Sequence, residues 1–557
     1  MTLDWRQWPA DLSPHWREAE TRLLSPGSPF ELTENAGSGL ATFRNIAPNL
    51  GALLAQAQTF AERSYIIYDD GAHHAELTFG DLYDRARRFA GWLQSEHGLQ
   101  PGDRVAILGA NTIEWVVAFW GTIAGGGIAV ALNAWWTAAE IAAALERTAP
   151  RLTLVDAKRR ERLPDSAAAA PLDESLLDTI RNTEPVASPH QAAPDDTAAI
   201  LFTSGTTGRA RGVMQTHRNM TTLVMCNFFH GARMALAGAL AAGVDQPPAP
   251  EPAAVLVTSP MFHVSGLHNA VLTVLAGGAT AILPGSRFRP AHVASLIERY
   301  RIKSWGYTET LLRRLLEAPD IDKHDLSSLA VIGGGGSPIP AALQDKARTT
   351  IPSAAATFGV GYGQTECGSL ATLNPGPELA AHPDSVGRPV PTVQIEIRDE
   401  TGKPVEDGVE GEIWVRSPMV MPGYWNDPEE TAAVLSEDGW LRTGDWGAIR
   451  GGRLYIASRK RDLILRGGEN VYPAEIEARL LEHPQVAEAA VVGVDSAEFG
   501  QEVKAVIVLA PGQQPDVDAL RDWCAETLAY FKVPTHWEIR NEPLPRNAVG
   551  KVLKHEL

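Results

Sequence analysis

The stretch Ala198-Ala199-Ile200-Leu201-Phe202, followed directly by Thr203-Ser204-Gly205-Thr206-Thr207-Gly208, is the most informative part of this chain. Its first half is a short apolar run, which is typical of a buried strand. Its second half contains only Gly, Ser and Thr, and two cations, Arg209 and Arg211, stand just beyond it. Glycine permits positive φ, successive N–H groups can then surround an anion, and hydroxyl groups donate to phosphate oxygens. We therefore interpret the stretch as a phosphate-binding loop that follows a strand, in preference to a flexible surface loop. The P-loop spacing is absent.

Length and composition limit the class of protein. A chain of 557 residues is too long for one core, so we expect two or more domains. A formal charge of −18 argues against general binding to nucleic acid or to an anionic membrane surface. The three cysteines, Cys226, Cys367 and Cys524, are too far apart in sequence to suggest a disulfide framework or a zinc site, which fits the cytoplasm. The N-terminal residues lack the basic and apolar regions of a signal peptide.

One segment resembles a membrane span by length. Residues 115–132 contain eighteen residues without a charge. Gly125-Gly126-Gly127 interrupts this segment and would weaken a helix. We predict a buried helix that ends near the glycines, followed by a buried strand over residues 128–132.

The order of apolar runs predicts the fold class. Short runs at 105–108, 128–132, 254–257 and 330–332 alternate with helical patterns, which is typical of parallel sheets covered by helices. Beyond about residue 385, apolar and polar residues alternate at 393–397 and 412–415, as in half-solvated antiparallel strands. We place a domain junction near Arg461 and find no internal repeat.

Two Ala/Pro-rich stretches interrupt this pattern. They cover residues 164–171 and 246–252, and we interpret both as surface excursions.

Four further clusters bear on chemistry, and each is ambiguous alone. They are the histidine of Pro260-Met261-Phe262-His263, the glycines of 333–338, the aromatic ring, hydroxyl and carboxylate within 359–366, and the aspartate of Arg442-Thr443-Gly444-Asp445. A lone histidine is usually structural, and four glycines can be a tight turn. A carboxylate can also hold Mg²⁺ on phosphate oxygens.

Taken together and in this order, the motifs strongly resemble those of the adenylate-forming superfamily, which includes acyl-CoA synthetases, luciferases and peptide-synthetase adenylation domains. The resemblance runs from about Tyr65 to the C-terminus. The matching segments are TSGTTG at 203–208, PMFH at 260–263, GGGGSP at 333–338, YGQTE at 362–366, RTGD at 442–445, SRKRDLILRGGENVYPAEIE at 458–477 and PRNAVGK at 545–551.

The resemblance implies an α/β fold with two domains. The large N-terminal domain, residues 1–460, would contain two helix-covered, mostly parallel sheets and a small distorted β-barrel. A mobile, smaller α+β domain, residues 461–557, would follow. The resemblance also implies two half-reactions in one site. A carboxylic acid and ATP give acyl-AMP and pyrophosphate, and CoA then displaces AMP to give acyl-CoA, with Mg²⁺ as cofactor.

The resemblance further assigns roles by position. Lys551 would stabilise the negative charge that the carboxylate and the α-phosphate share during adenylation, and the other catalytic groups would be Glu366, Thr206 and His263. Glu366 and Thr206 would bind the metal. Asp445 and Arg459 would bind the ribose. The implied ATP-binding residues are Thr203, Ser204, Gly205, Thr206, Thr207, Gly208, Arg211, Gly335, Gly336, Ser337, Pro338, Tyr362, Gly363, Gln364, Thr365, Glu366, Asp445, Arg459 and Lys551. The implied acid pocket consists of Phe262, His263, Val264, Gly336, Gly359 and Gly361, with residues near 305–308. Arg461 would be the hinge, and Gly467, Gly468 and Glu469 would line the CoA tunnel.

Two positions depart from the family pattern. Ala210-Arg211 replaces the usual Pro-Lys, and because a planar guanidinium differs from a compact ammonium, we expect altered phosphate affinity. Arg461 is also less common at the hinge than Asp or Lys.

The sequence does not identify the substrate acid. His263 stands where amino-acid-activating relatives have an aspartate, which argues against an amino acid, and glycine walls leave room for a bulky aryl or arylalkanoic acid or a medium- to long-chain fatty acid. We expect an ATP- and Mg²⁺-dependent acid–CoA ligase of fatty or aromatic acid metabolism. We expect it to be cytoplasmic and to have neither nucleic-acid partners nor a transmembrane segment. The resemblance allows a homodimer. Two alternatives are an adenylating enzyme that loads a carrier protein and an impaired nucleotide- or acyl-binding protein.

Overall fold

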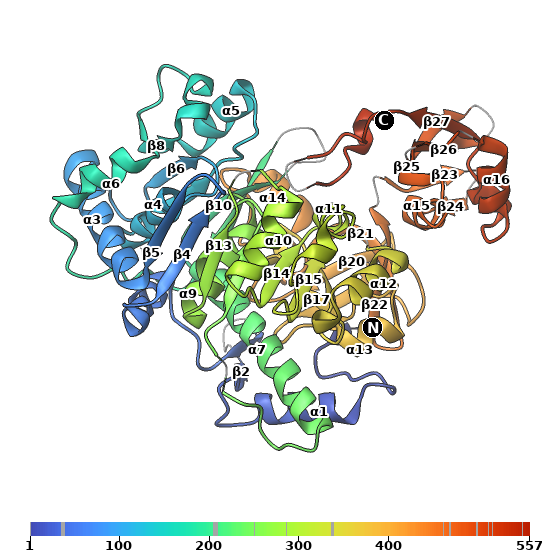
Figure 1. Ribbon diagram of the computed structural model, residues 1–557, viewed down its shortest axis with the longest axis horizontal. Coiled ribbons are helices and arrows are strands. Elements are labelled where there is room, and N and C mark those ends of the chain that lie inside the picture. The colour runs from blue at the N-terminus through green and yellow to red at the C-terminus, as the bar shows by residue number, and fades with distance from the viewer. Residues whose placement is uncertain are drawn as a thin grey trace.

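The computed structural model places the chain in a large body and a smaller C-terminal body joined to one side of it (Figure 1). The structure describes residues 2–34, 39–203, 210–249, 251–285, 287–335, 339–459, 462–466, 469–496, 499–510, 512–514, 516–547 and 550–557, without the side chains of residues 269, 270, 458, 459 and 470. Four sheets of five or more strands organise these residues.

The first sheet has the strand order β11-β10-β7-β6-β8-β9, and all its pairs are parallel except β10 with β11. Its strands are β6 (Arg104–Leu108), β7 (Ile128–Ala131), β8 (Leu152–Val155), β9 (Ala169–Pro171), β10 (Thr197–Thr203) and β11 (Arg211–Thr216). Helices α3 (Phe79–His97), α4 (Ile113–Ala124) and α6 (Glu174–Arg181) belong to the core on one face, and α5 (Ala138–Thr148) packs on the other. Both faces are therefore buried, which explains why these strands are continuous apolar runs.

The second sheet has nine strands in the order β18-β17-β16-β15-β14-β12-β13-β4-β5, with a parallel centre from β4 to β16 and antiparallel edges. The strands are β4 (Ser64–Asp69), β5 (His74–Thr78), β12 (Ala254–Val257), β13 (Thr280–Leu283), β14 (Ser304–Tyr307), β15 (Val331–Gly335), β16 (Gly359–Tyr362), β17 (Thr372–Pro375) and β18 (Arg388–Pro389). Helices α10 (Pro290–Arg299), α11 (Glu309–Leu316) and α12 (Ala341–Thr350) share one core with it.

The third sheet is antiparallel, in the order β1-β19-β20-β21-β22, and it begins with the first described residues of the chain. Its strands are β1 (Thr2–Asp4), β19 (Gln394–Arg398), β20 (Gly411–Arg416), β21 (Leu441–Arg450) and β22 (Arg453–Arg459). The C-terminal body contains β23 (Ile464–Arg466), β24 (Glu469–Val471), β25 (Val486–Ser496), β26 (Gly500–Leu509) and β27 (His536–Arg540), with α15 (Pro473–Leu481) and α16 (Val517–Ala525) packed on this sheet.

The remaining elements connect these sheets. The helices are α1 (Pro14–Leu24), α2 (Leu50–Ala55), α7 (His217–Ala241), α8 (Val264–Gly266), α9 (Val274–Gly277), α13 (Gly376–Ala381) and α14 (Pro428–Val434), with the π-helix η3 (Leu267–Thr273) between α8 and α9. A small hairpin joins β2 (Leu32–Glu34) and β3 (Ala41–Phe43). Figure 1 shows α7 as a long helix that runs toward α1.

The structure confirms most of the expected elements. Residues 115–132 form most of α4 and then β7, which are almost entirely buried, so the segment is core. By length and composition, one described helix, α7, could cross a membrane; this is weak evidence because the core helices of soluble proteins pass the same test.

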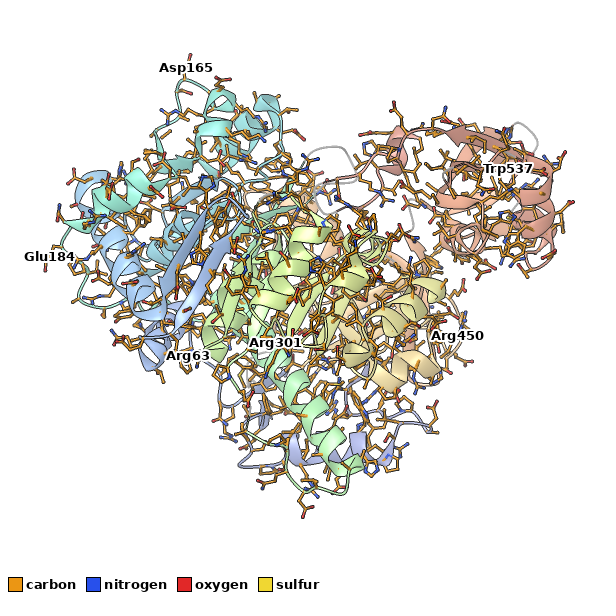
Figure 2. All side chains as sticks on the ribbon, in the orientation of Figure 1. Arg63, Asp165, Glu184, Arg301, Arg450 and Trp537 are labelled. Carbon is orange, nitrogen blue, oxygen red and sulfur yellow. The ribbon has the colours of Figure 1, made fainter. Side chains whose placement is uncertain are left out.

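Two expectations need correction. Residues 169–171 of the Ala/Pro-rich stretch form the edge strand β9, while Asp165 lies at its outer tip (Figure 2). The alternating strands β19 and β20 are antiparallel, but their polar residues Glu396 and Glu412 are buried. Glu396 accepts a hydrogen bond of 2.6 Å from Thr2 of β1, so the N-terminal strand covers an edge that the pattern suggested was solvated.

Candidate active site

The site lies where the parallel strands end at their carboxyl termini, the usual place for ligands in such sheets. β10 ends at Thr203, β15 at Gly335 and β16 at Tyr362, and all three residues line one cleft. Residues of β21 and of the C-terminal body line the same cleft. The fold therefore brings together motifs that are hundreds of residues apart in sequence.

Glu366 is held in place by two hydroxyl groups. It lies in a single turn of 3₁₀-helix directly after β16 and is 8% exposed. Thr203 Oγ1 donates to its Oε1 at 3.2 Å, and Tyr424 Oη donates to the same oxygen at 3.1 Å. Burial and the Glu366 carboxylate raise the pKa of Tyr424 above its ordinary value, so its hydroxyl remains a donor. The other carboxylate oxygen, Oε2, has no hydrogen-bond partner among the described residues and can bind a cation.

Arg211 joins this cluster from β11. Its Nη2 lies 2.6 Å from Oε2 of Glu430, and its guanidinium lies 5.3 Å from the centroid of the Tyr424 ring. The planar guanidinium makes both contacts at once, which an ammonium could not do in the same way. The residue that replaces the usual lysine is therefore fixed by Glu430 and Tyr424.

Tyr362 and Asp445 form a buried pair across the cleft. Tyr362 Oη donates to Oδ2 of Asp445 at 2.8 Å. Burial and this carboxylate raise the pKa of Tyr362 well above its ordinary value. The turn before Asp445 is set by Thr443, whose Oγ1 accepts from the Asp445 N–H at 3.1 Å, and by Gly444, which has a φ of 71°. Gln364 Nε2 also donates to the Thr443 carbonyl.

The glycines of the walls have two different roles. A Cβ at Gly335 would lie 2.4 Å from the carbonyl oxygen of Gly361, so glycine is required here by the close approach of β15 and β16. A Cβ at Gly333 would meet its nearest atom only at 4.0 Å, and one at Gly359 at 3.5 Å. Gly333 therefore leaves space in the cleft, whereas a Cβ at Gly359 would be in van der Waals contact with Pro375 and Gly335 allows the strands to pack.

The two aromatic residues of the 260–263 motif lie in different environments. Phe262 is 3% exposed, packs in the main core and does not line the cleft. His263 lines the cleft together with Val264, and its Nε2 is buried without a hydrogen-bond partner among the described residues. Burial lowers the pKa of His263 to about 4, so the ring is neutral at pH 7.

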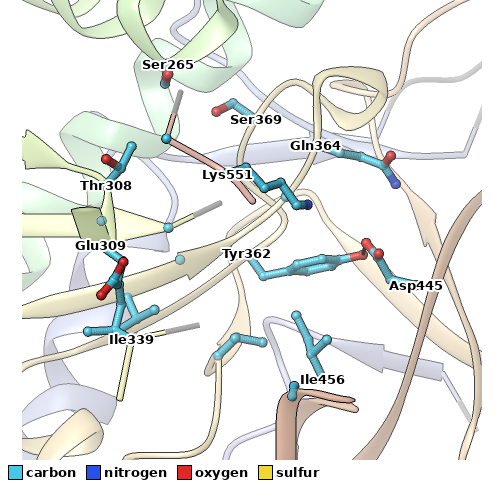
Figure 3. Close-up of a pocket in the computed structure, with 18 of the residues that line it drawn as sticks. Ser265, Thr308, Glu309, Ile339, Tyr362, Gln364, Ser369, Asp445, Ile456 and Lys551 are labelled. Carbon is cyan, nitrogen blue, oxygen red and sulfur yellow. Dashed lines mark hydrogen bonds between the residues drawn. The ribbon is translucent and has the colours of Figure 1, made fainter. Parts of the chain in front are cut away.

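Lys551 reaches the same cleft from the C-terminal segment (Figure 3). Asn547 holds its backbone: the Lys551 N–H donates to Oδ1 at 2.9 Å, and the Asn547 N–H donates to the Lys551 carbonyl at 2.8 Å. The carbonyl of Gly550 accepts from Thr310 Oγ1 at 3.2 Å and from Arg546 Nη1 at 2.8 Å. Thr310 belongs to α11, so these bonds attach the lysine segment to the large body.

Several predicted residues lie outside the described part of the chain. They are Ser204, Gly205, Thr206, Thr207, Gly208, Gly336, Ser337, Pro338, Arg461, Gly467, Gly468 and the side chain of Arg459. The backbone of Arg459 pairs with Asp445 in the register of β21 and β22, which agrees with a shared ligand. Glu469 is exposed in β24 and does not line the cleft in this arrangement.

Sequence reasoning missed one wall of the cleft. Residues on one side of α7 line it: Leu223, Asn227, Phe228, His230 and Gly231. Their spacing follows the helical period. The polar residues at this spacing, Asn227 and His230, could have indicated that this side of the helix faces a cleft.

A metal site made of protein groups alone is not present among the described residues, since no group of three or more His, Cys, Asp or Glu side chains could hold an ion there. This fits Mg²⁺, which proteins usually bind through one or two carboxylates together with water and substrate phosphates. Glu366 lines the cleft and has one carboxylate oxygen without a described partner.

Comparison with known proteins identifies the family. The AMP-binding enzyme family matches residues 53–425, and the AMP-binding enzyme C-terminal domain matches residues 475–551. A long-chain-fatty-acid–CoA ligase of Yersinia pestis is 34% identical over 522 residues, covering 86% of this chain and 89% of the relative. A 3-[(3aS,4S,7aS)-7a-methyl-1,5-dioxo-octahydro-1H-inden-4-yl]propanoyl:CoA ligase of Rhodococcus jostii is 33% identical, covering 91% and 97%. A fatty acid–[acyl-carrier-protein] ligase, ScoC, of Streptomyces coeruleorubidus is 34% identical, covering 86% and 91%.

Solved structures agree with this result. The o-succinylbenzoate CoA synthetase of Bacillus subtilis, in complex with its acyl-adenylate, has a TM-score of 0.78 and 31% identity over 92% of this chain and 98% of that one. The same enzyme with ATP and a magnesium ion has a TM-score of 0.76 and 31% identity over 91% and 98%. This chain therefore belongs to the AMP-binding enzyme family, in the acyl-CoA synthetase branch of the adenylate-forming superfamily. It is an AMP-forming acid–CoA ligase that uses ATP, Mg²⁺ and CoA.

Proposed function

We propose that this ligase activates a bulky hydrophobic acid, either an aryl or arylalkanoic acid or a medium- to long-chain fatty acid, and that Lys551 catalyses the adenylation step. The observation that carries the proposal is the position of Lys551. The C-terminal segment brings this lysine into the cleft that Tyr362, Glu366 and Asp445 line. An ammonium at that position stabilises the negative charge that the acid and the α-phosphate share as they react.

The phosphate side of the site is built around Glu366. Because Thr203 and Tyr424 both donate to its Oε1, the carboxylate keeps Oε2 directed away from these hydroxyls. When bound there, Mg²⁺ neutralises phosphate charge and favours departure of pyrophosphate. We assign Thr206 and the rest of the 203–208 loop to the same phosphates, with Thr365 and Arg211 beside them.

The nucleotide side is built around Tyr362 and Asp445. The Tyr362 ring is held at its hydroxyl end by Asp445, so its face is fixed for packing on adenine. Asp445 would accept hydrogen bonds from the ribose hydroxyls, and Arg459 would donate to them. Gly335, Gly336, Ser337 and Pro338 complete this side.

The acid would enter between β15, β16, α7 and the segment after His263. Neutral His263, whose Nε2 lacks a described partner, is placed to hydrogen-bond the reacting carboxyl group. The space beside Gly333 would accommodate part of a ring or chain. The relatives include a long-chain-fatty-acid–CoA ligase, a fused-ring propanoyl:CoA ligase and a feruloyl-CoA synthase of an Amycolatopsis species that is 34% identical, and their acids are all bulky.

The second half-reaction would follow a rotation of the C-terminal domain, residues 461–557, about Arg461. In the present arrangement Lys551 lines the cleft and Glu469 does not, which corresponds to adenylation. Rotation would withdraw Lys551 and bring Gly467, Gly468 and Glu469 to the site, where they would line the CoA tunnel.

Lys551→Ala tests the proposal. We expect the variant to lose acid-dependent pyrophosphate release by a factor of a hundred or more, while still forming acyl-CoA from a supplied acyl-adenylate. Lys554→Ala is the matched control, because Lys554 pairs with Glu477 at 2.5 Å. Equal loss of both half-reactions in Lys551→Ala would refute the two-step assignment.

The relative ScoC supports a second acceptor, a carrier protein. Thioester formation with free CoA and with a phosphopantetheinylated carrier, measured with the same acyl-adenylate, distinguishes the two. We propose a cytoplasmic enzyme, and sedimentation would test whether it is a homodimer.

A further inference from the structure

The α7 wall of the cleft carries polar groups at a place where a purely hydrocarbon substrate needs none. From Leu223 to His230 the stripe covers eight residues, or about 10 Å of helix. One turn further, α7 meets the start of α13: a Cβ at Gly376 would lie 3.6 Å from Cε of Met234. Gly231 is the last described residue of α7 that lines the cleft, so His230 lies at one end of this wall.

The tautomer of His230 is fixed by its neighbour. Arg233 Nη2 lies 3.2 Å from Nδ1 of His230. A guanidinium can only donate, so Nδ1 is the acceptor. Burial, together with the Arg233 charge, lowers the pKa of His230 to about 3, and the ring is neutral. The proton of the neutral ring is therefore on Nε2.

Arg233 is itself held from the N-terminal helix. Its Nη1 lies 2.8 Å from Oε1 of Glu20 in α1, and both side chains are less than a tenth exposed. Arg388 lies 3.0 Å from the same carboxylate oxygen. Because this network is buried and charged, the orientation of Arg233, and hence of the His230 ring, is strongly constrained.

Two observations indicate that the residues at this end of the wall bind a polar atom of a ligand. Nε2 of His230 has no hydrogen-bond partner among the described residues, although the residue lines the cleft. His268, in the π-helix η3, is 2% exposed, also lines the cleft, and has no described partner at either ring nitrogen. Asn227 Nδ2 donates to Thr273 Oγ1 at 3.2 Å, so α7 and η3 form adjoining walls. The two ring nitrogens of His268 are buried without partners, which is unfavourable unless a ligand completes them, whereas Nε2 of His230 remains accessible from the cleft and would lose its access to water when a substrate fills this end.

We propose that the far end of the acid pocket binds a hydrogen-bond acceptor of the substrate, a carbonyl, hydroxyl or ether oxygen remote from the carboxyl group, through the Nε2–H of His230, with His268 as a second polar contact. The inference rests on the proposed acid pocket and narrows its substrate class. A plain fatty acid would leave the donor unpaired, whereas an oxygenated aryl, polycyclic or alkyl acid would satisfy it.

The test uses a matched pair of arylalkanoic acids that differ only by a ketone in place of a methylene at the far end. For the full-length enzyme we expect kcat/KM to be at least tenfold higher for the keto acid. His230→Phe keeps an aromatic ring but removes the donor, and it should reduce the ratio of kcat/KM between the keto and methylene acids to within about twofold of one. His230→Gln, which restores a donor, should recover part of the preference.

Three outcomes contradict the inference: no preference in the unmodified enzyme, equal loss for both acids in a folded His230→Phe variant, or no turnover with either acid. The first two leave the ligase function intact, whereas failure of the whole acid panel to release AMP contradicts the proposed function as well. Nitrogen-15 NMR of histidine-labelled enzyme, assigned with His230→Phe, gives a substrate-independent readout. A His230 ring protonated on Nδ1 overturns the inference.

Discussion

Replacement of Thr310 by valine should slow adenylation without affecting thioester formation. Thr310 Oγ1 donates to the Gly550 carbonyl at 3.2 Å and accepts from Arg546 Nη1 at 3.1 Å. Valine keeps the shape of the side chain but removes both bonds. At about 0.5–1.5 kcal/mol for each of the two bonds, the docked arrangement of the Lys551 segment loses roughly 1–3 kcal/mol. This corresponds to about a 5- to 150-fold lower rate of acid-dependent pyrophosphate release, where docking limits that step.

The assay compares two reactions of the same variant: pyrophosphate release from acid and ATP, and acyl-CoA formation from a supplied acyl-adenylate. Only the first should change, because the Thr310 contacts exist when Lys551 lies in the cleft. Thr349→Val in α12 is the matched control, since Thr349 is exposed and bonds only to the Asp345 carbonyl within its own helix. If Thr310→Val slowed both reactions equally, or neither, the docking argument would be wrong.

Three further outcomes are expected. Tyr424→Phe removes one of the two hydroxyl donors to Glu366 and should raise the Mg²⁺ concentration for half-maximal activity several-fold, as measured by a magnesium titration at fixed ATP. Gly335→Ala should lower the unfolding free energy by about 1–3 kcal/mol in denaturant titrations, because its Cβ would meet the Gly361 carbonyl at 2.4 Å; an unchanged midpoint would contradict this. The pKa of His263 is about 4 in the folded chain and near 6.5 in an unfolded one, so the unfolded state binds more protons as pH falls. This residue alone should therefore reduce stability by roughly 1–2 kcal/mol between pH 6.5 and 5, and His263→Asn should show a correspondingly weaker loss over that interval.

Much of the fold was predictable because its cause is local in sequence. The continuous apolar runs that became β6, β7, β10 and β12 are buried on both faces, and this burial produces the pattern. The alternating runs that became β19 and β20 were correctly predicted as antiparallel, but their solvation was wrong. β1 is nearly four hundred residues away from β19 in sequence, so no local pattern predicts that Thr2 covers Glu396.

In the site, too, some features follow from local sequence and others from contacts between distant segments. The sequence by itself determined the chemical groups: a Ser/Thr/Gly loop after a strand, the Tyr362 and Glu366 segment, Asp445 and Lys551, in an order that specifies an adenylating family. Only the tertiary structure decided their partners. It joined Tyr362 to Asp445, placed Thr203 and Tyr424 on one oxygen of Glu366, and attached Gly550 to Thr310. It also turned the polar stripe of α7 toward the cleft. Hydrogen bonds act over about 3 Å in space, whatever the separation along the chain, so residue types can be read from sequence but contacts between distant segments arise only when the sheets and helices pack.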